Sequence, residues 1–184
     1  MQTETFDVVD LGAGDGRLYK IFQEKNIKFH SYTALDISPN MLNKHPPITS
    51  SLMPAPSSAG KEGDHEVVED LKKIVANLES DLPLEDNAFD LAFSFFVIEH
   101  INNIDNLFAE IERILKPGGT WIIGYFLQRR EFIRKIKKDN YKIEIIKHRI
   151  QDLEKIAQKN LFQTHIIPIE EKGALIGHLL ICEK

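Results

Sequence analysis

The sequence predicts an α/β protein with a doubly wound, mostly parallel seven-stranded sheet that ends in a C-terminal antiparallel hairpin. Apolar runs of strand length alternate with segments of helical periodicity, which is the pattern of a parallel sheet covered by helices on both faces. The last two apolar runs are joined by a short polar connection, so these two strands are expected to pair antiparallel. The length of 184 residues predicts a single domain over 1–184.

The first half of the chain carries the alternation of strand and helix. Its strands are predicted from nearly continuous apolar runs, as buried parallel strands require, and its helices from apolar residues that recur on one face. The expected elements are a strand over 6–11, a helix over 17–25, a strand over 31–35, a helix that begins at Ser38-Pro39, a short helical segment near Glu66 and a strand near 73–76.

The second half repeats this pattern and then changes to the hairpin. A Pro117-Gly118-Gly119 turn is expected to end the helix that precedes it. The expected elements are a strand over 89–97, a helix over 104–115, a strand over 120–126, a basic helical stretch over 128–138, a helix over about 150–160, and strands over 162–169 and 175–182. Between the two halves, 46–64 is rich in Pro, Ser, Gly and Ala and is predicted to be a flexible insertion.

Composition narrows the classes of function. The formal net charge of -5 gives no general attraction to nucleic acid or anionic lipid. The first residues carry no basic segment followed by an apolar one, and no run approaches the roughly 20 apolar residues of a membrane span. We therefore expect a cytoplasmic protein that does not bind membranes. Cys182 is the one cysteine, so no internal disulfide is expected, and the histidines show no spacing typical of a metal site.

The turn after the first strand predicts a nucleotide-like ligand. Gly12, Gly14 and Gly16 lie between strand and helix, where missing side chains let a ligand approach the backbone. Asp36 follows the second strand, where a carboxylate can accept hydrogen bonds from both hydroxyls of a ribose. A tight turn and an ordinary capping acid are the alternative interpretation of the same features.

The spacing of the turn argues against a dinucleotide. In the dinucleotide fingerprint G-x-G-x-x-G the third glycine comes one position later than Gly16 does here, at the place of Arg17. Asp10 also precedes the turn, and a carboxylate there suits a cationic group such as an amino-acid ammonium, whereas it would repel a pyrophosphate.

With these features the sequence resembles the class I S-adenosylmethionine-dependent methyltransferases, whose fold is Rossmann-like. Five segments match the family's motifs in the correct order, and the resemblance covers the chain from Phe6 to Phe126. They are VDLGAGDG at 9–16, TALDISPNML at 33–42, LPLEDNAFD at 82–90, VIEH at 97–100 and ILKPGG at 114–119.

The resemblance implies a role for individual residues toward S-adenosyl-L-methionine. Asp10, Gly12, Ala13 and Gly14 would hold its methionine part, and Asp36 its ribose. The adenine would lie against Ile37 and Met41 and near Asn77 and Leu78, with Glu79 as an alternative to Asn77 for its amino group. Ser94 and Phe95, at the end of the fourth predicted strand, would face the reactive end of the cofactor.

Two departures from the family concern what covers the site. Members usually carry helices ahead of the first motif, whereas here that motif comes only a few residues after Met1. A homodimer or a protein partner on this open N-terminal side would supply the cover. The insertion at 46–64 lies beside the expected adenine site, and we weigh two interpretations of it, a solvated linker and a lid.

Catalytic residues are harder to predict, because a sulfonium methyl group is already activated. A general base is needed only for an acceptor that keeps its proton at neutral pH. His100 is the candidate from its position after the fourth strand, and a structural role for Glu99-His100 is the alternative.

Three functions remain open from the sequence. The first is methyl transfer to an unidentified small molecule, with RNA or protein as other acceptors; the basic stretch over 129–149 could contact RNA, although a solvated helix face is the alternative. The second is a non-catalytic module that binds the cofactor and acts with a protein partner. The third is a nucleotide-dependent oxidoreductase, against which the glycine spacing argues.

Overall fold

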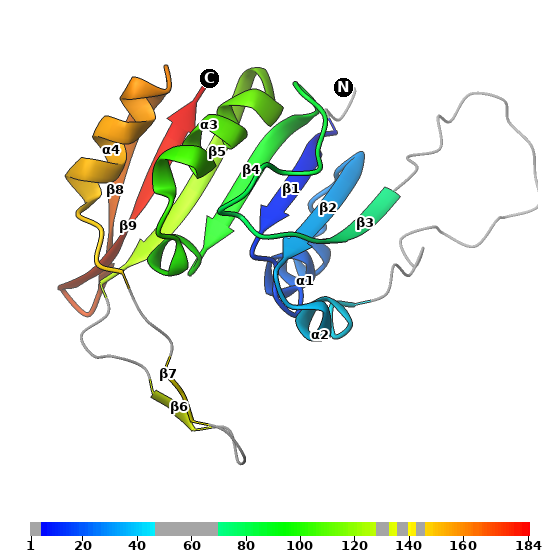
Figure 1. Ribbon diagram of the computed structural model, residues 1–184, viewed down its shortest axis with the longest axis horizontal. Helices are drawn as coiled ribbons and strands as arrows, with labels where there is room; N and C mark the ends of the chain where they lie inside the picture. The colour runs from blue at the N-terminus through cyan, green and yellow to red at the C-terminus, as the bar shows by residue number, and fades with distance from the viewer. Residues whose placement is uncertain (1–4, 47–69, 128–132, 136–139, 143–145) are drawn as a thin grey trace, which may run out of the picture.

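The computed structural model describes residues 5–46, 70–127, 133–135, 140–142 and 146–184. Seven strands form one sheet in the order β3-β2-β1-β4-β5-β9-β8 (Figure 1). Its strands are β1 (Asp7–Leu11), β2 (Ser31–Asp36), β3 (Asp70–Val75), β4 (Phe89–Phe95), β5 (Leu115–Phe126), β8 (Gln163–Glu171) and β9 (Ala174–Glu183). The first five strands pair in parallel, and β9 pairs antiparallel with both β5 and β8. The predicted fold class is confirmed.

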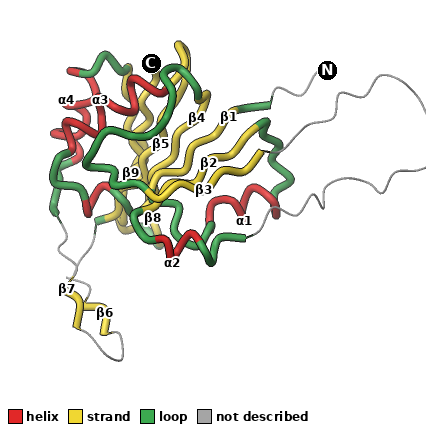
Figure 2. Tube along the Cα trace, turned by 45° about the vertical axis from the view of Figure 1, so that its right-hand side comes forward, coloured by secondary structure: helices red, strands yellow, loops and turns green. Residues whose placement is uncertain are grey.

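Helices lie on both faces of the sheet (Figure 2). They are α1 (Arg17–Glu24), α2 (Pro39–Leu42), the 3-10 turn η1 (Ile98–His100), α3 (Ile104–Ile114) and α4 (Ile150–Lys159). One apolar core contains residues of α3 and α4, and the second contains residues of α1 and α2. Ala92 and Phe93 of β4 belong to different cores, because successive strand residues point to opposite faces. None of the helices in the described parts of the chain could span a membrane.

The strand order places a crevice at one edge of the sheet. From β1 the chain builds β2 and β3 on one side, and it then crosses to build β4 and β5 on the other. Because all five strands are parallel, their carboxyl ends share an edge, and ligands of such sheets bind where the order reverses. Here that point lies between the ends of β1 and β4.

Two predicted segments differ from the described structure or lie outside it. A helix was expected over 128–138, whereas residues 133–135 form β6 (Ile133–Lys135), which pairs antiparallel with β7 (Asn140–Lys142). The β-branched Ile133 and the aromatic Tyr141 both favour strands, and in 133–135 this preference outweighs the helical spacing of the basic residues. The predicted insertion at 46–64 and the short helix near Glu66 lie outside the described residues, apart from Pro46.

Candidate functional site

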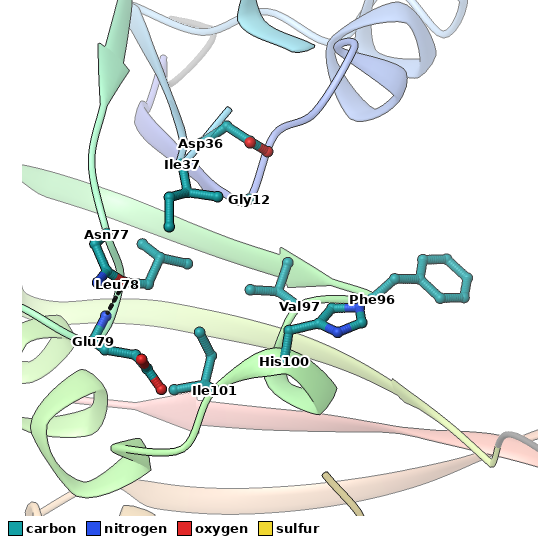
Figure 3. A pocket seen from close by; sticks show the side chains of 10 residues that line it. All are labelled: Gly12, Asp36, Ile37, Asn77, Leu78, Glu79, Phe96, Val97, His100 and Ile101. Atoms are coloured by element: carbon teal, nitrogen blue, oxygen red, sulfur yellow. Dashed lines mark hydrogen bonds between the residues drawn. The ribbon is translucent and has the colours of Figure 1, made fainter. Parts of the chain in front are cut away.

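A cavity of about 410 Å³ opens at the carboxyl ends of β1, β2 and β4 (Figure 3). This volume lies in the range of small-molecule and cofactor sites, roughly 300–1,000 Å³. Ten residues line it: Gly12, Asp36, Ile37, Asn77, Leu78, Glu79, Phe96, Val97, His100 and Ile101. Apolar side chains are the most numerous among these residues. The polar side chains are two carboxylates, one amide and one imidazole.

The glycine turn after β1 forms one wall. Gly12 has a φ of 72°, in the left-handed region, and a Cβ added to it would lie 2.4 Å from Cγ2 of Val97. A residue with a side chain would therefore be strained and would also collide with Val97. The close packing of Gly12 on Val97 ties the first loop to the end of β4.

Asp36 is held by two backbone groups. The N–H of Gly14 donates to Oδ2 at 2.9 Å, and the N–H of Ser38 donates to Oδ1 at 2.8 Å. Each carboxylate oxygen can accept a second hydrogen bond. The side chain therefore has a fixed orientation at the edge of the cavity and keeps capacity for two hydroxyl groups of a ligand.

Asp10 lies beneath the turn and does not line the cavity. It is 4% exposed, and the hydroxyl of Tyr32 donates a 2.6 Å hydrogen bond to its Oδ2. Burial raises the pKa of Asp10 to about 6; the bond from Tyr32 opposes this rise, and the charge of Asp36 adds to it. A neighbouring cation would favour its ionised form.

The loop after β3 forms the wall opposite the glycine turn. The side-chain oxygen of Asn77 accepts the N–H of Glu79 at 3.0 Å, and Leu78 is buried beside it. Oε1 of Glu79 accepts the N–H groups of Asn102 and Asn103, and these bonds lower the pKa of Glu79. The loop is thereby attached to the start of α3, with the Asn77 amide at the cavity.

Phe96 and His100 lie at the other end. In Figure 3 the residues from Asn77 to Glu79 are at the left of the cavity, whereas the ring of Phe96 projects to the right and that of His100 lies beside it. Phe96 has a φ of 60° and is 50% exposed. Its ring stacks on that of Phe126, with centroids 4.3 Å apart and planes inclined by 10°.

The structure brings together half of the residues that the sequence singled out. Those that line the cavity are Gly12, Asp36, Ile37, Asn77, Leu78 and His100, together with Glu79, the alternative to Asn77. Those that do not are Asp10, Ala13, Gly14, Met41, Ser94 and Phe95. Gly14 and Met41 are near one another, since a Cβ on Gly14 would lie 3.6 Å from the methyl carbon of Met41. Ala13 is buried and donates its N–H to the carbonyl of Leu35 at 2.8 Å.

Ser94 and Phe95 have partners within the protein. Oγ of Ser94 accepts a 3.0 Å hydrogen bond from Nε1 of Trp121, and both residues are fully buried. The ring of Phe95 stacks on Phe93 at 6.1 Å and occupies the space over Gly124. Their predicted contact with the cofactor stays a prediction.

Phe96, Val97 and Ile101 line the cavity although the sequence gave no reason to select them individually. Val97 is the first residue of the VIEH segment at 97–100, which matches a motif of the family. The position of Phe96 depends on its left-handed backbone, for which a phenylalanine carries no sequence signal.

The site defines a class of protein: an α/β domain that binds a nucleoside-containing cofactor beside a glycine turn. A methyltransferase domain family model matches residues 9–123. The chain belongs to this family, the class I S-adenosylmethionine-dependent methyltransferases, and S-adenosylmethionine is the family's cofactor.

Relatives of known description are longer than this chain. It is 39% identical over 75 residues to a sterol 4-C-methyltransferase of Caenorhabditis elegans, covering 41% of this chain and 22% of that protein. A ubiquinone/menaquinone biosynthesis C-methyltransferase of Shewanella pealeana is 30% identical, covering 76% and 50%. A mitochondrial arginine-hydroxylase of Dictyostelium discoideum is 24% identical, covering 90% and 39%. The chain thus spans half or less of the length of these three proteins.

Solved structures share the fold at low sequence identity. A methyltransferase of Methanosarcina mazei superimposes with a TM-score of 0.67 at 19% identity, covering 99% of this chain and 93% of that one. A chain in the complex of the Haloferax volcanii Trm112 methyltransferase activator with a methyltransferase gives 0.68 at 18%, covering 100% and 84%. A Burkholderia thailandensis 1,6-didemethyltoxoflavin-N1-methyltransferase with bound S-adenosylhomocysteine gives 0.64 at 17%, covering 98% and 72%.

Proposed function

We propose that the protein transfers the methyl group of S-adenosylmethionine to a small-molecule acceptor. The observation that carries the proposal is the carboxylate of Asp36, fixed by the N–H groups of Gly14 and Ser38 at the edge of a largely apolar cavity. Such a carboxylate suits a vicinal diol, and the apolar walls suit the base attached to it.

The residues present fit the cofactor. Asp36 would accept from the two ribose hydroxyls, Ile37 and Leu78 would lie against the adenine, and the amide of Asn77 would meet its polar edge. The turn at Gly12 would hold the methionine part. When bound, the cofactor supplies a methyl group that is already activated on a sulfonium, so the protein mainly aligns the acceptor with it and excludes water.

A small acceptor accords with the descriptions of the relatives, which name sterol and quinone methylation. His100 is proposed to accept the proton of an acceptor that is protonated at neutral pH, because its imidazole lies at the cavity end beside Phe96. For such an acceptor, replacing His100 by glutamine should lower the rate at least roughly hundredfold. An unchanged rate would reduce His100 to a structural role.

Calorimetric titration with S-adenosylhomocysteine tests the cofactor site. The wild-type protein should bind saturably, and Asp36→Ala should lose measurable binding while its near-ultraviolet circular dichroism shows that it is folded. Asp15→Ala is the matched control, because Asp15 lies in the same turn but faces Lys20 at 3.5 Å and does not line the cavity. A folded wild-type protein without binding, or equal binding by Asp36→Ala, would contradict the proposal.

Two alternatives are each supported by a similarity to a known protein. The complex of a structural neighbour with the Trm112 methyltransferase activator supports a protein partner for this chain. A homodimer stays a prediction, which light scattering coupled to size exclusion would test. The similarity to an arginine-hydroxylase supports a reaction other than methylation. Methyl transfer to a protein stays a prediction. Cofactor binding without turnover on any acceptor would favour a non-catalytic module. Contact of 129–149 with RNA stays a prediction, since most of that stretch lies outside the described residues.

A further inference from the structure

Phe96 and Phe126 form a stacked aromatic pair at one end of the cavity. They come from the carboxyl ends of the neighbouring strands β4 and β5, and their rings are nearly parallel at 4.3 Å. Phe96 is 50% exposed, and Leu127 next to the pair is 41% exposed. An apolar surface thus continues outward from the cavity wall.

Folding does not account for this pair. Neither ring belongs to the two apolar cores of the described residues. The left-handed backbone of Phe96, φ 60°, is costly for a residue with a bulky side chain. Strain and exposed apolar surface that stabilise no core are typical of binding sites.

Contacts with Glu99 and with β9 hold the pair in place. The N–H of Phe126 donates a 3.2 Å hydrogen bond to Oε1 of Glu99, whose side chain is 1% exposed. Across the sheet Phe126 faces Gly177, where an added Cβ would lie 2.6 Å from the carbonyl oxygen of Tyr125 and 3.1 Å from Cδ1 of the Phe126 ring. A glycine on β9 thus leaves room for the ring, and a buried carboxylate fixes its backbone, as a preorganised surface requires.

The location assigns the pair to the acceptor and not to the cofactor. With the adenosine residues Asp36 and Asn77 elsewhere in the cavity, the Phe96 end is the one left for the transferred methyl group (Figure 3). The two carboxylates that line the cavity, Asp36 and Glu79, come from the end of β2 and the loop after β3 and not from the Phe96 end (Figure 3). Among the lining residues, the polar side chain that lies beside Phe96 is His100.

From these observations we propose that Phe96 and Phe126 bind the methyl acceptor by stacking, and that the acceptor is an uncharged molecule with a flat, unsaturated ring. A ring on the exposed part of Phe96 extends the existing stack, and such contacts discriminate flat rings from saturated ones. The inference rests on the proposed function, because the cofactor must occupy the other end of the cavity.

The test uses 2-naphthol as a flat, neutral probe and 2-decalol as a saturated molecule with the same two fused rings. Each is titrated by calorimetry into the protein saturated with S-adenosylhomocysteine. We expect 2-naphthol to bind and 2-decalol to bind at least roughly threefold more weakly. Phe96→Leu and Phe126→Leu should each weaken 2-naphthol roughly threefold to tenfold, whereas Phe96→Tyr, which keeps the ring, should not. Affinity for S-adenosylhomocysteine should be unchanged in all three.

Leu161→Ala is the matched control, because Leu161 is also apolar, has a φ of 66° and is 83% exposed, but lies beyond α4. It should bind 2-naphthol as the wild type does. Equal binding of the two probes, undiminished 2-naphthol binding by both leucine variants, or no 2-naphthol binding to a protein that binds S-adenosylhomocysteine would overturn the inference alone. A wild-type protein that does not bind S-adenosylhomocysteine would overturn the proposed function and the inference with it.

Discussion

Oδ2 of Asp36 accepts a 2.9 Å hydrogen bond from the backbone N–H of Gly14, twenty-two residues earlier in the chain. The residue proposed to bind the ribose therefore also connects the loop after β1 to the end of β2. With Oδ1 occupied by the N–H of Ser38, both oxygens meet a donor, and only a carboxylate offers two acceptor atoms in this geometry.

Asp36→Asn is expected to destabilise the protein even without ligand. The amide nitrogen would face one of the two backbone N–H groups, and a donor left unsatisfied costs about 1–3 kcal/mol where it is shielded from water. Urea denaturation monitored by circular dichroism measures the free energy of unfolding. Asp15→Asn, in the exposed part of the same turn, should change it little. Equal stabilities of wild type and Asp36→Asn would show that the lost hydrogen bond contributes no net energy.

Gly12→Ala should separate steric exclusion from backbone strain when compared with Gly118→Ala. Both glycines have a positive φ, 72° and 81°, but a Cβ meets Val97 at 2.4 Å at the first and nothing within 4 Å at the second. Gly118→Ala should cost about 1–3 kcal/mol of strain, and Gly12→Ala should cost more. Urea denaturation gives both values.

Adding Val97→Ala to Gly12→Ala provides the control for the contact. The double variant should recover part of the loss relative to the sum of the two single variants, because the methyl groups that collide are then absent. Strict additivity, or equal effects of Gly12→Ala and Gly118→Ala, would argue against a steric role of Val97.

Ser94→Ala distinguishes a structural from a cofactor-binding serine. Trp121 would keep a fully buried indole N–H without an acceptor, so the free energy of unfolding should fall by about 1–3 kcal/mol. Affinity for S-adenosylhomocysteine should stay within a factor of two. A variant with normal stability and weakened binding would instead support the sequence-based assignment of Ser94 to the cofactor.

The central part of the fold could be predicted because its sequence signals are local. Gly12 and Gly14 follow an apolar strand, and Asp36 ends the next, so parallel pairing alone brings them to the same edge. The family match over 9–123 confirms the resemblance on which the cofactor was predicted.

The end of β4 could not be predicted in the same way. Which of Ser94, Phe95 and Phe96 faces the cavity depends on where the two-residue alternation of the strand ends, and the left-handed φ of Phe96 ends it there. The stacked partner Phe126 lies thirty residues later, on β5. A local pattern does not encode such a pairing, and for the same reason the local sequence predicts a helix over 128–138, where residues 133–135 instead pair as β6 with β7.

The buried carboxylate of Asp10 predicts a pH dependence with a definite sign. Its pKa is raised from 3.8 to about 6, so the folded state binds the proton more tightly than the unfolded state does. The stabilisation from protonated Asp10 is complete below the unfolded pKa and is lost as the pH rises through about 6. With about 1.4 kcal/mol for each pKa unit, the loss is on the order of 2–3 kcal/mol.

Comparison with Asp10→Asn isolates this contribution, because other titrating groups cancel in the difference and the amide oxygen can still accept from Tyr32. The stability of the wild type minus that of the variant should fall by this amount between pH 4 and pH 7, as measured by urea denaturation. Affinity for S-adenosylhomocysteine should rise over the same interval in the wild type and not in the variant, because its ammonium group favours the ionised carboxylate. A stability difference independent of pH would mean that Asp10 ionises in the fold as it does in the unfolded chain. A rise in affinity shared by Asp10→Asn would place the titrating group elsewhere.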